Sequence, residues 1–109
     1  KEVMGDKMSM IIEYFLEDSQ TYMRDIDTAL PANDFETIAA RAHTLKSSSR
    51  EMGANQVSEI ARELEETARV AKDGTAPDCR KVTALVEDLK ISYVAAEREL
   101  AEFLESLSG

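Results

Sequence analysis

The single histidine of this chain, His43, is followed at helical spacing by residues that suit phosphoryl chemistry. Lys46 and Ser47 lie three and four residues after it and Arg50 lies seven after it, so on a helix these side chains share one surface strip. A neutral imidazole has one ring nitrogen with a free lone pair that can attack phosphorus. A nearby ammonium such as Lys46 can stabilise the negative oxygens that the ring then carries. The pattern therefore favours a histidine that accepts a phosphoryl group.

Small side chains surround the histidine on the same strip. Towards the amino terminus the strip carries only Ala39 and Ala40, and Ser47 follows His43 by one turn. No bulky side chain of its own helix would obstruct a partner that approaches the ring in line. We therefore expect Ala39, Ala40, Ser47 and Arg50 to lie under a docked partner. For Arg50, an ordinary solvated charge in a weak ion pair is the competing interpretation.

The elements that must position these residues follow from the spacing of apolar side chains. Apolar residues recur at three- and four-residue steps in four segments, approximately 8–30, 34–52, 56–73 and 78–107. Pro31 stops the first segment. Asn33 is placed to cap the second helix, with Glu36 three residues later as its capping-box partner. Gly53 and Gly74 supply left-handed residues after the second and third helices.

Four amphipathic helices joined by short connections predict an all-α, antiparallel, up-down-up-down four-helix bundle. The 109 residues are enough for one core, so residues 1–109 form a single domain in this interpretation. The apolar stripe of the first helix includes Met8 and Ile11 near its beginning. The apolar stripe of the last helix includes Phe103 and Leu107 near its end. We expect these stripes to face the core.

Glu65 is the polar residue expected to face His43. If the second and third helices turn back on each other around Gly53 and Ala54, residues equidistant from that turn face one another. His43 then lies opposite Leu64 and Glu65. The Glu65 carboxylate would accept a hydrogen bond from the ring nitrogen that does not attack, which fixes the tautomer and increases the nucleophilicity of the other nitrogen. An ordinary solvated helix acid is an equal alternative for this residue.

Charge and composition argue against several classes of partner and location. The formal charge of −9 argues against a nucleic-acid partner, which requires clustered Lys and Arg. One cysteine, Cys79, allows neither an intramolecular disulfide nor a thiolate zinc site, and it fits a reducing compartment. The longest apolar run is too short for a bilayer. We expect a cytoplasmic monomer that does not insert into membranes.

Motifs for metal and nucleotide chemistry are absent from the sequence. Carboxylate-bridged di-iron sites in helical bundles need Glu-x-x-His pairs on two helices, and here Ala40 stands three positions before the only histidine. There is also no glycine-rich phosphate loop with its lysine. We therefore expect no metal or cofactor of its own, no ATP site, and a carrier rather than an enzyme.

The segment from Ala42 to Ala54, Ala-His-Thr-Leu-Lys-Ser-Ser-Ser-Arg-Glu-Met-Gly-Ala, resembles the signature of the histidine-containing phosphotransfer family. That signature is commonly written Ala-His-x-Leu-Lys-Gly-Ser, followed by a Gly-Ala pair. Further similar pairs are Phe15-Leu16, Ala29-Leu30 and Leu64-Glu65. The resemblance implies that His43 is the phosphoacceptor and Lys46 the phosphate-stabilising lysine. Ser47 is the main departure, because the family usually has glycine there.

The resemblance also implies a role in two-component phosphorelays. The chain would accept a phosphoryl group on His43 from a receiver-domain aspartate and pass it to another receiver aspartate. Its partners would be response-regulator receiver domains, which bring the aspartate and Mg²⁺, and a hybrid sensor histidine kinase if the chain is its terminal module. Two alternatives stay open: a phosphorylation-independent helical adaptor, and a carrier phosphorylated directly by a kinase domain.

Overall fold

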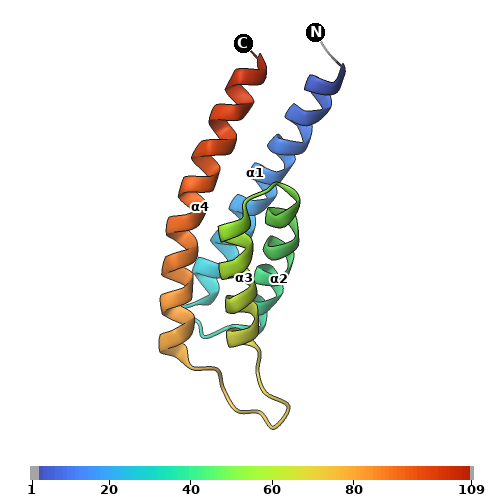
Figure 1. Ribbon diagram of the computed structural model, residues 1–109. Helices are drawn as coiled ribbons and strands as arrows, with labels where there is room; N and C mark the ends of the chain where they lie inside the picture. Colours follow the sequence, from blue (N-terminus) through green and yellow to red (C-terminus); the bar gives the residue numbers. More distant parts are fainter. Residues whose placement is uncertain (1–2, 109) are drawn as a thin grey trace.

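Four helices account for most of the chain. The computed structural model describes the backbone of residues 3–108 and the side chains of residues 7–107. The helices are α1 (Val3–Ala29), α2 (Phe35–Glu51), α3 (Asn55–Ala68) and α4 (Cys79–Ser108). Figure 1 shows that successive helices run in opposite directions, so that α1 begins and α4 ends at the same end of the molecule. The predicted all-α, up-down-up-down bundle is confirmed.

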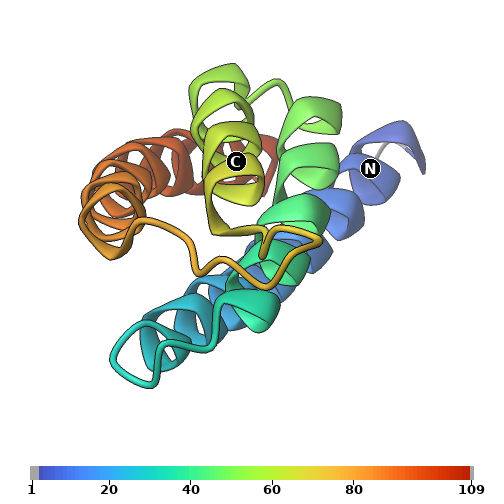
Figure 2. The same cartoon turned by 90° about the horizontal axis from the view of Figure 1, so that it is seen from below.

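The core lies where all four helices meet. Each helix packs on its neighbours in sequence, and α4 closes the ring against α1; Figure 2 shows this arrangement from below. The core cluster consists of Ile26, Ala29, Ile38, Ala42, Leu45, Val57, Ala61, Leu64, Ala68, Val82, Val86 and Leu89. Ala42 of α2 and Ala61 of α3 are fully buried, and such small side chains allow two helices to approach closely. The α2–α3 pair is thereby a close hairpin.

The start of α2 differs from the predicted capping box. Asp34, rather than Asn33, is the N-cap: its carboxylate accepts hydrogen bonds from the Thr37 backbone N–H at 3.2 Å and from the Thr37 hydroxyl at 2.7 Å. Asn33 instead adopts a left-handed conformation with φ 54° in the turn before it. Asparagine tolerates this conformation better than most residues, which explains its place in the turn. The predicted role of Gly53 is confirmed, because it has φ 78° directly after the C-cap residue Met52.

The third helix is shorter than the predicted segment 56–73. It ends at Ala68, because Arg69 has extended dihedral angles, φ −68° and ψ 130°. Ala68 is fully buried, whereas Val70 and Ala71 beyond it are exposed, so no apolar face remains to hold another turn against the bundle. The connection from Arg69 to α4 ends at Asp78, whose side chain accepts a hydrogen bond from the Arg80 backbone N–H at 3.0 Å.

The outer ends of α1 and α4 are less buried than predicted. Met8 and Ile11 of α1 and Phe103 of α4 are exposed rather than part of the core. The reason is geometric, because α2 and α3 are shorter than α1 and α4. Beyond the α2–α3 turn, α1 and α4 continue without α2 and α3 to cover them (Figure 1). α1 also begins at Val3, earlier than the predicted residue 8. Within the described range, none of the helices is long and apolar enough to cross a membrane.

Candidate functional site

His43 is the middle residue of α2 and points away from the core. Its side chain is 60% exposed, whereas Ala42 and Leu45 beside it on the same helix are fully buried. The exposed position agrees with the surface strip predicted for His43 from the sequence. Burial of a leucine side chain contributes about 1.5 to 3 kcal/mol, so Leu45 anchors the turn that carries the exposed imidazole.

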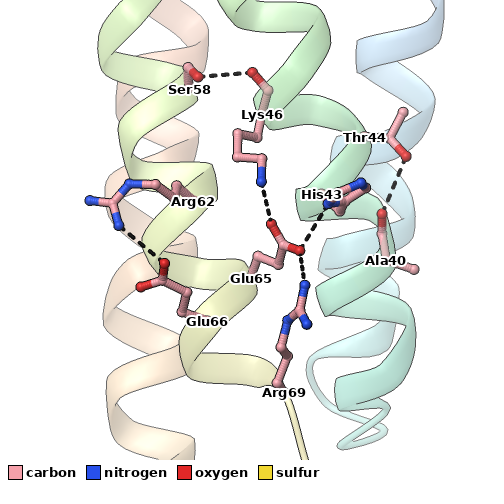
Figure 3. A network of polar contacts seen from close by, with 9 residues as sticks. All are labelled: Ala40, His43, Thr44, Lys46, Ser58, Arg62, Glu65, Glu66 and Arg69. Atoms are coloured by element: carbon pink, nitrogen blue, oxygen red, sulfur yellow. Dashed lines mark hydrogen bonds and ion pairs between the residues drawn. The ribbon is translucent and has the colours of Figure 1, made fainter.

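Glu65 of α3 connects the polar side chains around the histidine. Its side chain is only 4% exposed, and its Oε2 lies 2.9 Å from Nδ1 of His43. Oε1 accepts a hydrogen bond from Nζ of Lys46 at 3.0 Å, and Oε2 also accepts one from the Arg69 guanidinium. Figure 3 shows Lys46 and Arg69 reaching the carboxylate from opposite sides, with the imidazole meeting it from a third side. The predicted contact between His43 and Glu65 is thus present, and Glu65 is not a solvated helix acid.

The ionisation of Glu65 determines which ring nitrogen of His43 carries a proton. Burial alone would raise the pKa of the Glu65 carboxyl, but hydrogen bonds from Lys46, Arg69 and His43 outweigh burial and lower the pKa from 4.5 to about 2. At neutral pH the group is a carboxylate, which only accepts hydrogen bonds. Nδ1 must therefore be the donor, and in the neutral imidazole the free lone pair belongs to Nε2.

An open hollow of about 510 Å³ lies beside the ring, between α2 and the end of α3. Its lining residues are Ala39, Ala40, Arg41, His43, Thr44, Glu65 and Arg69. The two alanines leave this side of the imidazole accessible, as their size predicts. Arg41, at one wall, donates a hydrogen bond from its Nε to Asp25 of α1 at 2.7 Å.

Of the other predicted residues, only Lys46 belongs to the polar network around Glu65. Its side chain is 22% exposed, and its backbone carbonyl accepts a hydrogen bond from the Ser58 hydroxyl at 2.8 Å, which ties α3 to α2. Ser47 is exposed one turn after His43. Arg50 is exposed in the last turn of α2, away from the hollow.

Sequence reasoning missed Arg69. The signal was available, because Glu65 and Arg69 are four residues apart and this spacing brings side chains together on a helix. In the predicted helix 56–73 this pair would lie inside the helix on a solvated face, where such pairs are common. The end of α3 at Ala68 places Arg69 at the edge of the hollow instead.

We expect acid to weaken the contribution of Glu65 to stability between about pH 4.5 and about pH 2. A carboxyl whose pKa is lowered on folding stabilises the folded state above its unfolded pKa, and this stabilisation is lost as pH falls through the folded pKa. The full effect is at most about 3 kcal/mol, because exposed partners such as Arg69 and His43 are screened by solvent. Denaturant unfolding of the wild type and Glu65→Gln, at neutral pH and at about pH 2.5, measures it.

The wild type should be the more stable protein at neutral pH, and the difference should shrink at the acidic pH. Asp34 and Asp73, whose pKa values are also lowered by hydrogen bonds to Thr37 and Thr75, titrate in both proteins and cancel in the comparison. A difference in unfolding free energy that is the same at both pH values would contradict the prediction.

Comparison with known proteins agrees with this geometry. The model of the Hpt domain family matches residues 10–108, and the chain therefore belongs to that family. The crystal structure of histidine-containing phosphotransfer protein B (HptB) from Pseudomonas aeruginosa PAO1 is similar to the present structure with a TM-score of 0.82. The two sequences are 27% identical, and the match covers 96% of this chain and 86% of that one. No curated protein matches this chain.

Membership of the family defines the class of activity. Hpt domains are histidine carriers of phosphorelays rather than conventional enzymes, and they interact with receiver domains. This chain is accordingly a phosphorelay carrier that works between receiver domains, as its resemblance implied.

Proposed function

We propose that His43 is the residue that accepts the phosphoryl group from one receiver aspartate and passes it to another. The observation that carries the proposal is the hydrogen bond between Nδ1 and Glu65 at 2.9 Å on a ring whose side chain is 60% exposed. The hydrogen bond leaves the lone pair on Nε2. The exposure makes the ring accessible to a partner. His43 is also the one histidine in the sequence.

The transfer step follows from this tautomer. The Nε2 lone pair attacks phosphorus of the aspartyl phosphate, the N–P bond forms, and the P–O bond breaks so that its electron pair leaves with the receiver carboxylate. The proton on Nδ1 stays in place, and the ring becomes positively charged. Glu65, ionised at neutral pH, stabilises that charge through the same hydrogen bond. Transfer to the second aspartate is the reverse of this step.

Lys46 has two roles in the proposal. Its ammonium, bonded to Oε1 of Glu65 at 3.0 Å, holds the carboxylate in position for the ring. It also supplies positive charge one turn from His43, where the phosphoryl oxygens accumulate negative charge. Ala39, Ala40, Ser47 and Arg50 belong to the surface over which we expect the receiver to dock.

The proposal also covers the cofactors, location and phosphoryl donor of the carrier. We expect the carrier to have neither an ATP site nor a cofactor, since the receiver supplies Mg²⁺ for the transfer. We expect it to act as a cytoplasmic monomer, either free or as a module of a membrane-anchored hybrid sensor kinase. Direct phosphorylation by a kinase domain remains the second candidate donor, and its readout is label transferred from ATP when no receiver is present.

The test is transfer from a purified receiver that carries radiolabelled phosphate on its aspartate. We expect label to appear on this chain and to be lost in acid but retained in base, as a phosphoramidate requires. Label that survives acid would indicate a phosphoester on Ser or Thr. No label from any receiver or kinase donor would favour the phosphorylation-independent adaptor instead.

Lys46→Ala should slow acceptance and shorten the lifetime of the phosphorylated form. The lost charge-assisted contact contributes about 1.5 to 3 kcal/mol, which corresponds to roughly 10- to 150-fold in rate. Lys46 lies outside the core, so circular dichroism should still report a folded bundle. Lys81→Ala, at an exposed lysine near the start of α4, is the matched control. Unchanged rate and lifetime would reassign Lys46 to a purely structural bridge.

A further inference from the structure

Arg69 is the cation that borders the hollow beside the imidazole on the α3 side. It follows α3 directly, its side chain is 65% exposed, and it lines the same hollow as His43. Lys46 does not line that hollow and approaches Glu65 from the other side (Figure 3). The two cations therefore flank the Glu65 carboxylate, and the one that borders the hollow is Arg69.

The charges at this centre are suited to an added anion. Two cations, Lys46 and Arg69, bond to one carboxylate, so the group carries one excess positive charge while the imidazole is neutral. A phosphoryl group on nitrogen brings a charge of about −1.5 to −2. Glu65 is bonded to the same ring, and its negative charge opposes an added anion unless nearby cations offset it.

We propose that Arg69 exchanges its hydrogen bond to Glu65 for one to the phosphoryl group when His43 is phosphorylated. The proposal rests on His43 being the acceptor. No covalent bond changes in this exchange: the guanidinium N–H leaves Oε2 and donates to a phosphoryl oxygen. Glu65 remains satisfied, because Lys46 still donates to Oε1 and the Nδ1–H of the ring still donates to Oε2.

Two other arginines of the α2–α3 pair are bonded to other carboxylates. Arg41 is paired through its Nε with Asp25 of α1 at 2.7 Å. Arg62, on α3, is paired with Glu59 at 3.0 Å and with Glu66 at 3.2 Å. Arg69 differs from both because its partner is the same carboxylate oxygen that the reacting ring uses. Release of that one hydrogen bond would free a long, exposed guanidinium beside the ring.

The experiment uses the full chain phosphorylated with phosphoramidate, a small donor whose P–N bond breaks to release ammonia as the bond to Nε2 forms. The variants are Arg69→Gln and Arg69→Lys. Arg62→Gln is the matched control, because Arg62 and Glu66 form the same four-residue pair on the same helix. Phosphorus NMR follows the titration of the phosphoryl group, and nitrogen NMR follows the guanidinium Nε–H signals before and after phosphorylation.

Loss of the contact in Arg69→Gln should raise the pKa of the phosphoryl group and slow its formation by about tenfold. Arg69→Lys should recover part of both effects, and Arg62→Gln should match the wild type. In the wild type, the Arg69 Nε–H signal should move on phosphorylation and the Arg62 signal should not.

A merely structural role for Arg69 predicts the opposite pattern. The Arg69 signal would then stay unchanged on phosphorylation, and the phosphoryl pKa of Arg69→Gln would equal that of Arg62→Gln, which would overturn the exchange. Failure of the wild type to form phosphohistidine with either phosphoramidate or a phosphorylated receiver is a different result, because it would overturn the assignment of His43 itself.

Discussion

Replacing His43 with Gln should abolish phosphoryl acceptance while leaving the bundle folded. The ring is mostly exposed, so its removal takes no apolar side chain from the core. The Gln amide can still donate a hydrogen bond to Glu65, which keeps the buried carboxylate satisfied. Its nitrogen has no nucleophilic lone pair, because that pair is delocalised into the carbonyl. The hydrogen bonds of Glu65 are therefore kept, whereas phosphoryl acceptance is lost.

The measurement is label transferred from a phosphorylated receiver, with circular dichroism on the same sample. Glu102→Gln is the control, because Glu102 is an exposed residue on the outer part of α4 and should transfer at the wild-type rate. Residual acid-labile label on His43→Gln would place the acceptor on another residue, and the tautomer set by Glu65 would then have no role in transfer.

Ser47→Phe should reduce transfer from a receiver by at least about 100-fold, since a displacement of reacting groups by about 1 Å can already cost that much. Ser47 is exposed one turn after His43, so a bulky ring at this position separates the docked receiver from Nε2. The side chain points outward, so the bundle should keep its helical signal. Phosphorylation by phosphoramidate, which needs no protein docking, should stay near the wild-type rate.

Two further variants separate steric obstruction from a general effect of phenylalanine. Ser106→Phe places the same ring on the exposed outer part of α4 and should transfer normally. Ser47→Gly introduces the residue usual in the family and should transfer as fast or faster, with a loss of helix stability of about 0.5 kcal/mol. Normal transfer by Ser47→Phe would mean that the receiver approaches from another direction.

The helices and their order were predictable because helix formation depends mainly on local spacing. The recurrence of buried residues such as Ile38, Ala42 and Leu45 at three- and four-residue steps identifies α2 and leaves His43 at the edge of its apolar stripe. Hairpin symmetry about Gly53 correctly placed Glu65 opposite His43. These inferences need only the helical repeat and a tight turn.

Helix ends were predicted less well, because they depend on small competing preferences. Asn33 and Asp34 both suit an N-cap, and the choice between them was decided by the left-handed turn that brings the chain back from α1. The sequence 69–73 can continue a helix, yet α3 stops at Ala68 because the core ends there. Likewise, Met8 and Phe103 follow the apolar pattern of their helices but lie beyond the reach of α2 and α3.

The sequence by itself determined an all-α bundle, a single histidine on a surface strip with Lys46, and an acidic residue facing it. Only the tertiary structure decided that Glu65 is buried and shared by His43, Lys46 and Arg69. The physical reason is that these contacts depend on how α2 and α3 are rotated and translated against each other, which is set by packing of residues such as Ala42 and Ala61 far apart in the chain. Local periodicity specifies which face of a helix is apolar, whereas the partners of a buried carboxylate are specified by the packing of both helices together.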